Sequence, residues 1–200
     1  MNSIFPNKSA PLPLDSWSKE PLPIFAPPQL SPTRKEWTIS LLLFLATLLT
    51  TTFAGFVYYS GGESGEVASS MLPVFHPSLL TAGLSFSVPF LGILLAHELG
   101  HFFACRYYSI SCTPPFFIPL PLNMAGTLGA FIRIRSPFPD KRALFDVGVA
   151  GPLAGFIMTL PILFFGIAQS RLIPITEMPD GISFGEPMIF RWIGAWVLGY

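Results

Sequence analysis

Charged residues are scarce in this sequence. Lys and Arg together number 11, Asp and Glu together number 11, and these four types make up 11% of the 200 residues, whereas a soluble domain carries about 25%. The zero net charge excludes a nucleic-acid partner held by electrostatic attraction. Cysteine is nearly absent: only Cys105 and Cys112 occur, which excludes a disulfide scaffold. The two do not form a C-x-x-C pair, so we interpret both as free thiols and expect no thiolate zinc site.

Hydrophobic residues take the place of the missing charge. They make up 51% of the chain, and the mean hydropathy is +0.58. About 20 apolar residues are needed to cross the hydrocarbon core of a bilayer. Residues 37–59 contain no charge and predict a first transmembrane helix. Residues 67–96 are also free of charge, and we expect a second helix over 79–107 with a kink at Pro89.

Two further apolar runs follow. A third transmembrane helix is predicted over 144–167, where Gly151 and Gly155 have the spacing that permits close helix contact. The run 189–200 is too short to cross a bilayer, so we expect the chain to stop inside a truncated fourth helix. The fold class predicted is an all-α multi-pass membrane protein with three full transmembrane helices plus this truncated fourth.

The segment between the second and third helices does not have a helical sequence. Four prolines, Pro114, Pro115, Pro119 and Pro121, favour extended backbone over residues 109–136. Residues 132–135 alternate Ile and Arg, which predicts a strand. Backbone that is not helical survives at membrane depth only inside protein or beside a water-filled cavity. We therefore predict a re-entrant, β-hairpin-like loop next to the active site.

The ends of the chain indicate its orientation. Residues 1–36 contain eight prolines and no periodic pattern, so we expect a disordered tail. Lys and Arg concentrate in this tail and between the second and third helices, whereas the connection after the first helix has none. This bias predicts a cytoplasmic N-terminus. The tail is not Arg-rich like a transit peptide, which favours a bacterial plasma membrane over a plastid.

One short motif carries chemistry. Residues 97–101 read His-Glu-Leu-Gly-His, an H-E-x-x-H sequence on a predicted helix. Histidines four residues apart share one helical face, so both can bind one Zn²⁺, and Glu98 can act as general base on a bound water. The alternative is a pair of core histidines satisfied by hydrogen bonds. That alternative is weakened because ionisable residues in a membrane helix are costly unless they have a function.

Together with two later features, the motif resembles the site-2 proteases, a family of intramembrane zinc metalloproteases. The later features are the run 126–130, Gly-Thr-Leu-Gly-Ala, and Asp146 ahead of Ala-Gly-Pro at 150–152. The resemblance implies a membrane domain over 79–200 in which His97 and His101 bind zinc and Glu98 activates the hydrolytic water. It also implies that the loop holds substrate in an extended form through four residues: Gly126, Thr127, Leu128 and Gly129.

One family feature is missing before Tyr200. Site-2 proteases take a third zinc ligand from an Asp in a later helix, in an Asn-x-x-Pro-x(3)-Leu-Asp-Gly setting, and no such motif occurs in this sequence. Asp146 fits a helix start or a loop anchor better than a metal ligand. We interpret Asp180 as part of a polar turn and His76 as an outer-loop residue, so neither is predicted to bind the metal. We therefore expect the third ligand to lie beyond Tyr200.

The function predicted is intramembrane cleavage of transmembrane segments by a zinc endopeptidase. Its partners would be a transmembrane peptide or protein substrate and the lipid bilayer, with no nucleic acid, and nothing indicates an oligomeric state. The alternative is a catalytically inactive membrane scaffold that retains the motif. A zinc transporter would need acids and histidines on several helices, and a soluble zinc protease is excluded by the membrane-length runs.

Overall fold

The computed structural model describes residues 31–60, 77–121, 123–170, 185 and 187–199. Most of the predicted tail, together with His76 and Asp180, lies outside them. In chain order the elements are α1 (Arg34–Ser60), α2 (Pro77–Tyr107), β1 (Phe116–Pro119), β2 (Thr127–Phe131), α3 (Lys141–Ala168) and α4 (Met188–Leu198).

Three of the helices are long and apolar enough to cross a membrane: Arg34–Val57, Leu80–Tyr107 and Lys141–Ala168. The three predicted helices are thus confirmed, and each is a candidate membrane span by its length and composition. Two of them begin about one turn earlier than the apolar runs because polar caps extend them. At α1, the Thr33 N–H donates to Glu36 Oε2 at 2.8 Å and the Glu36 N–H to Thr33 Oγ1 at 3.3 Å. At α3, Asp140 accepts from the Ala143 N–H at 2.7 Å.

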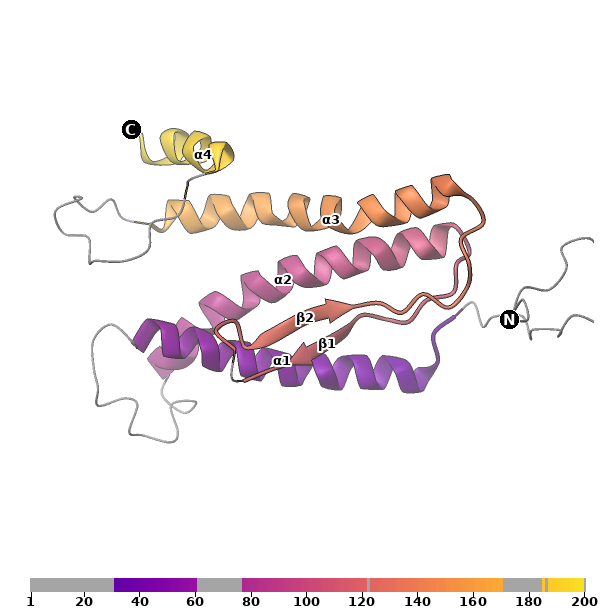
Figure 1. Ribbon diagram of the computed structural model, residues 1–200. Helices are drawn as coiled ribbons and strands as arrows, with labels where there is room; N and C mark the ends of the chain where they lie inside the picture. The colour runs from indigo at the N-terminus through magenta and orange to yellow at the C-terminus, as the bar shows by residue number, and fades with distance from the viewer. Residues whose placement is uncertain (1–30, 61–76, 122, 171–184, 186, 200) are drawn as a thin grey trace, which may run out of the picture.

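The three long helices alternate in direction, with α2 between α3 and α1 (Figure 1). The N-terminal ends of α1 and α3 and the C-terminal end of α2 therefore lie at the same end of the molecule. Basic residues gather at this shared end: Arg34, Lys35, Arg106, Lys141 and Arg142. The short helix α4 follows at the other end and contacts α3.

The segment between α2 and α3 forms a hairpin, so the fold is mostly helical and not purely α. β1 pairs with β2 antiparallel, with Phe116 opposite Phe131 and Phe117 opposite Ala130. The strand predicted at 132–135 is displaced: β2 ends at Phe131, and only an isolated bridge joins Cys112 to Ile134. Pro114 and Pro115, which have no N–H to donate, lie between this bridge and the Phe116–Phe131 pair, so the ladder is interrupted there.

Helix α1 supports the hairpin along its length. Ser40 donates to the carbonyl of Pro115, Thr50 Oγ1 donates to the carbonyl of Gly126 at 2.6 Å, and Glu36 pairs with Arg135. These contacts satisfy backbone groups that would be costly to leave unpaired in an apolar setting. Part of the hairpin backbone is thus hydrogen-bonded to α1, while side chains such as Met124 and Leu128 remain exposed.

Gly126 sits against this support in a way that no other residue type would permit. Its φ is +73°, and a Cβ there would lie 2.4 Å from the Thr50 carbonyl oxygen. Gly129 also has a positive φ, +107°, but a Cβ there would have nothing within 4 Å. Substitution of Gly129 would therefore add backbone strain alone, whereas substitution of Gly126 would add both backbone strain and a steric clash.

We expect Gly126→Ala to destabilise the protein more than Gly129→Ala. Both variants should lose about 1–2 kcal/mol through the unfavourable φ, and only Gly126→Ala should lose more by pushing the hairpin off α1. Thermal unfolding in detergent, followed by circular dichroism, measures the difference. Equal losses for the two variants would contradict the close contact with Thr50.

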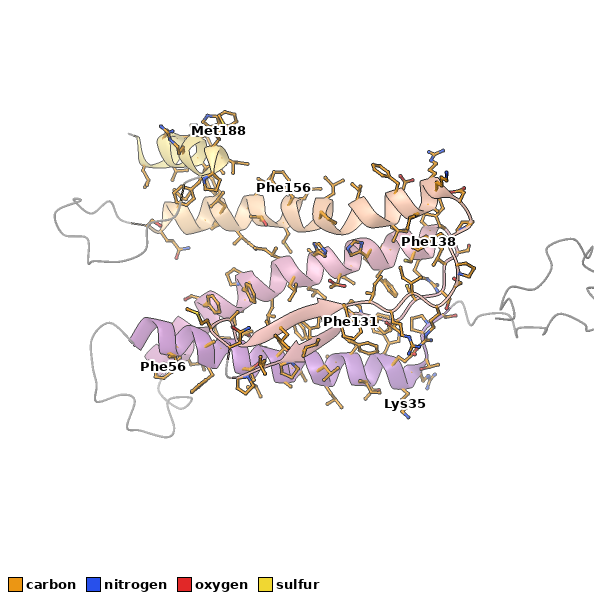
Figure 2. All side chains as sticks on the ribbon, in the orientation of Figure 1. Lys35, Phe56, Phe131, Phe138, Phe156 and Met188 are labelled. Carbon is orange, nitrogen blue, oxygen red and sulfur yellow. The ribbon has the colours of Figure 1, made fainter. Side chains whose placement is uncertain are left out.

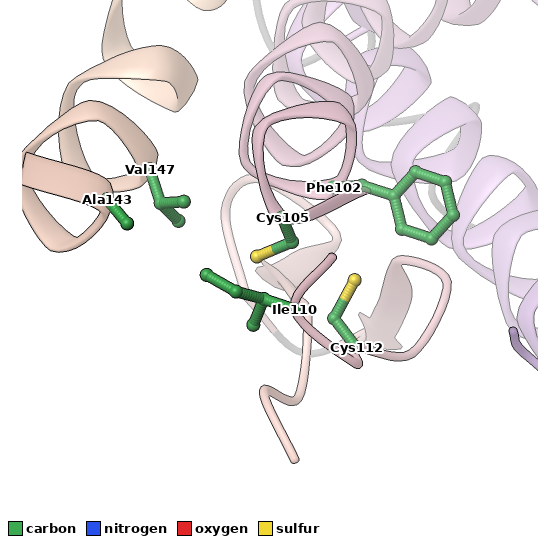
Figure 3. Close-up of a cluster of buried hydrophobic side chains, with 6 residues drawn as sticks. All are labelled: Phe102, Cys105, Ile110, Cys112, Ala143 and Val147. Carbon is green, nitrogen blue, oxygen red and sulfur yellow. The ribbon is translucent and has the colours of Figure 1, made fainter. Parts of the chain in front are cut away.

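A buried cluster closes the shared basic end. It joins α2, the loop after it and the first turns of α3, as Figure 3 shows. Its members are Phe102, Cys105, Ile110, Cys112, Ala143 and Val147. Both cysteines are buried free thiols, as the sequence predicts. The cluster holds the C-terminal turns of α2, which follow the H-E-x-x-H motif, firmly against α3.

Candidate active site

The two motif histidines lie on one face of α2 and point to the same place. His97 Nε2 and His101 Nε2 are 3.1 Å apart. Two nitrogen ligands at about 2.0–2.1 Å from a tetrahedral zinc ion would be about 3.3 Å apart. The observed separation therefore fits a shared metal ion with almost no movement of the rings.

The neighbouring helix selects the ring nitrogen that His101 offers to a metal. His101 Nδ1 lies 2.7 Å from the backbone carbonyl oxygen of Val147 on α3. A carbonyl only accepts, so Nδ1 carries the proton and, in the neutral ring, Nε2 keeps its lone pair. This is the orienting contact that metal-binding histidines usually have.

Two glycines on α3 make room for the histidines. A Cβ at Gly151 would lie 2.1 Å from His101 Nε2, and a Cβ at Gly155 would lie 3.4 Å from His97 Cβ. Gly100 on α2 packs equally closely, since a Cβ there would lie 2.4 Å from the Ala150 carbonyl oxygen. The predicted close contact at Gly151 and Gly155 is confirmed, and its additional effect is to seat the His101 ring directly on α3.

Glu98 lies beside the histidines and is nearly enclosed. Its exposed fraction is 6%, and the backbone N–H of Ile132, just after β2, faces its carboxylate. The hairpin therefore reaches the motif through its backbone. A single donor in this position leaves other carboxylate lone pairs available to accept a proton.

A cavity of about 460 Å³ opens beside Glu98 and His101. The hairpin and the segment after it provide one wall, and the N-terminal half of α3 provides the other. The lining residues besides the two motif residues are Ala130, Phe131, Ile132, Ile134, Phe138, Leu144, Val147 and Gly148. Figure 2 labels Phe131 and Phe138, which come from the hairpin and the turn before α3.

The four predicted substrate residues lie further along the hairpin. Gly126 is packed on α1, and Thr127 Oγ1 donates to the Ile118 carbonyl at 2.7 Å. Leu128 is 64% exposed, and Gly129 faces open space. The residues beside Glu98 are instead the next ones, from Ala130 to Ile134. Sequence reasoning missed them because the Ile-Arg alternation indicates a strand without indicating what it faces.

Asp146 anchors the end of α2. Tyr108 donates to its carboxylate, and Arg142 Nε lies 3.7 Å from the same oxygen. The hydrogen bond to Asp146 raises the pKa of Tyr108 above its ordinary value. These contacts agree with the predicted anchoring role. Among the described residues no group of three or more His, Cys, Asp or Glu could hold a metal ion.

Comparison with known proteins gives a consistent result. The family described as Peptidase family M50 matches residues 85–194, which include the motif, the hairpin and α3. The chain is 32% identical over 180 residues to rice "Probable zinc metalloprotease EGY1, chloroplastic", covering 82% of this chain and 30% of the relative. It is 29% identical over 180 residues to the Arabidopsis protein of the same name, covering 82% of this chain and 32% of the relative.

Arabidopsis "Probable zinc metalloprotease EGY2, chloroplastic" is 31% identical over 132 residues, covering 66% of this chain and 23% of the relative. The chain thus spans less than a third of the length of these curated relatives. No solved structure matches it. The names of the relatives place them in chloroplasts, which gives no support to the expectation of a bacterial plasma membrane.

Proposed function

Because this chain belongs to peptidase family M50, we propose that it provides the zinc-binding helix and the substrate loop of an intramembrane zinc endopeptidase. The resemblance to the site-2 proteases is thereby confirmed at the level of the family. The observation that carries the proposal is the pair of Nε2 atoms 3.1 Å apart on α2, with His101 oriented by the Val147 carbonyl. A helix that spans a membrane has no structural need for this arrangement.

In this proposal His97 and His101 hold the zinc ion through their Nε2 atoms. When bound, zinc polarises the scissile carbonyl and lowers the pKa of a water molecule. Glu98 accepts a proton from the attacking water on a carboxylate oxygen and passes it to the leaving amide nitrogen. The Ile132 N–H faces this carboxylate, and the apolar cavity walls limit access of bulk water.

The substrate in this proposal is a transmembrane segment bound in extended form. A peptide bond in an intact helix is shielded by the helix itself, and pairing with a strand edge would stabilise the unwound form. β1 occupies one edge of β2, and the edge that continues to Ile132 approaches Glu98. The edge of the hairpin before Ile132 would bind the part of the substrate further from Glu98. Its residues are Gly126, Thr127, Leu128 and Gly129.

The third zinc ligand is proposed to be an aspartate outside the described residues, as in the site-2 proteases. A catalytic zinc site normally has three protein ligands and one water. The alternative of an inactive scaffold is less well supported, because a scaffold would not need both imidazoles turned toward one point and a buried carboxylate next to them.

We also propose that the shared basic end of the helices faces the cytoplasm or its equivalent compartment, because basic residues favour that side. This places the N-terminus there. The tail composition favours a bacterial plasma membrane, and the names of the relatives favour a chloroplast membrane. Import of the whole protein into isolated chloroplasts, with removal of a leader, would decide for the chloroplast; failure of import would support the bacterial membrane.

Zinc content tests the proposal directly. We expect the whole protein, purified in detergent, to contain one zinc ion per chain by elemental analysis and to cleave a transmembrane peptide in liposomes. His101→Ala should lose most of the zinc, and a chelator should stop cleavage until zinc is restored. His76→Ala, which alters the third histidine of the chain, is the matched control. Absence of zinc, or an equal loss in His76→Ala, would refute the proposal.

A further inference from the structure

The cavity beside Glu98 extends past the metal-binding residues toward the start of α3. Of its lining residues only Glu98 and His101 are ionisable. The remainder are apolar or glycine, and they continue along α3 through Val147 and Leu144 and across to Phe138 and Ile134. A volume of about 460 Å³ is in the range of built ligand pockets, about 300–1,000 Å³.

We propose that Leu144 and Phe138 form a specificity pocket for a large apolar side chain of the substrate a few residues from the scissile bond. This inference rests on the proposed peptidase function and adds the chemistry of the residue selected. At the end of the cavity formed by Leu144 and Phe138 the lining residues are apolar, so a charged substrate side chain would lose water there without gaining a partner. An aliphatic or aromatic side chain would instead be stabilised by burying its apolar surface.

The position of Leu144 on α3 indicates which substrate residue it contacts. It lies three residues before Val147, whose carbonyl orients His101, and residues three apart share a helix face. The metal-binding Nε2 of His101 lies against Gly151, which is seven residues, roughly 10 Å, further along α3 than Leu144. Successive residues of an extended chain are about 3.3 Å apart, so the side chain that reaches Leu144 belongs to a residue about three positions from the cleaved bond.

The hydrogen bonds of the hairpin indicate which of its edges is open to a substrate strand. The Thr113 N–H donates to the Arg133 carbonyl at 3.0 Å, and the Arg135 N–H donates to the Ser111 carbonyl at 2.8 Å. Residues 133 and 135 thus pair inward, whereas the Ile132 N–H points outward to Glu98. A substrate strand on this outer edge runs between the hairpin and α3, which carries its side chains past Phe138 and Leu144.

The test uses the whole protein and a transmembrane peptide whose cleavage site has been mapped by mass spectrometry. The four residues on each side of the cleaved bond are changed in turn to Ala, Leu, Phe and Lys. We expect wild type to prefer Leu and Phe over Ala and Lys by about tenfold or more in kcat/KM at one of these positions. Equal cleavage of the Lys and Leu peptides at every position would overturn the inference.

Leu144→Trp should fill the pocket and lower kcat/KM for the Phe peptide about tenfold relative to the Ala peptide. Leu153→Trp is the matched control, because Leu153 lies on the same helix, is 54% exposed where Leu144 is 53% exposed, and does not line the cavity. Leu144→Ala guards against misfolding of the Trp variant and should shift preference toward larger residues. Zinc content should stay at the wild-type value in all three variants.

The two failures are distinguishable. If no peptide is cleaved in a Glu98-dependent way, the proposed peptidase function fails. If cleavage depends on Glu98 but both Leu144 variants keep the wild-type ratio of Phe to Ala cleavage, the specificity pocket alone is refuted.

Discussion

Glu98→Gln is expected to lower the cleavage rate of the whole protein by about 10²–10⁴-fold, the usual contribution of a general acid–base group. The substitution keeps the size of the side chain and one oxygen that can accept from the Ile132 N–H. It removes the ability to take up a proton from water. Since His97 and His101 are unchanged, zinc content should remain at one ion per chain.

The measurement is kcat for a transmembrane peptide in liposomes, with zinc determined on the same samples. Glu36→Gln is the matched control, because Glu36 caps α1 and pairs with Arg135 outside the cavity. It should reduce the rate by less than about threefold, in line with the small value of exposed ion pairs. Full activity in Glu98→Gln, or a comparable loss in Glu36→Gln, would remove Glu98 from the proposed mechanism.

Gly151→Ala should weaken zinc binding by about 10–100-fold, the usual cost of losing an orienting contact behind a metal ligand. The added methyl group would lie 2.1 Å from His101 Nε2 and 2.4 Å from two other ring atoms. The ring must therefore move away from α3 and give up its hydrogen bond to the Val147 carbonyl. The helix itself has no reason to unfold, because Ala is a better helix former than Gly.

Titration with Co²⁺, followed by visible absorption, measures this loss without relying on activity. Gly166→Ala is the matched control on the same helix, since a Cβ there would have nothing within 4 Å, and its Co²⁺ affinity should be that of wild type. Gly155→Ala should stay close to wild type, because its Cβ would lie 3.4 Å from His97 Cβ, an ordinary van der Waals distance. Wild-type Co²⁺ affinity in Gly151→Ala would show that metal binding does not require the contact of the His101 ring with α3.

Some elements of the fold were predictable from the sequence and others were not. The three long helices were predictable because an apolar run of this length has few other stable conformations. Their first turns were not, since the caps at Thr33 and Asp140 are polar and lie outside the runs. The hairpin was predictable from its prolines and glycines, but its register was not. Pairing depends on which residues have an N–H to donate, and Pro114 and Pro115 interrupt the ladder between the Cys112–Ile134 bridge and the Phe116–Phe131 pair.

The candidate site likewise has features that the sequence predicts and features that it does not. The spacing of His97, Glu98 and His101 is a local property, because residues four apart on any α-helix share a face. The order of residues along the chain was therefore enough to place two zinc ligands and a base together. The same order also marked Gly151 and Gly155 as a helix contact.

Only the tertiary structure assigns the groups around that motif. Three backbone groups from distant parts of the chain surround the motif. The Val147 carbonyl accepts the proton on His101 Nδ1, the backbone of Gly151 contacts the His101 ring, and the Ile132 N–H faces Glu98. Every residue has a backbone carbonyl and nearly every one an N–H, so residue type does not distinguish these groups from others. Their roles follow from the packing of α3 and the hairpin on α2, which makes them the neighbours of the motif.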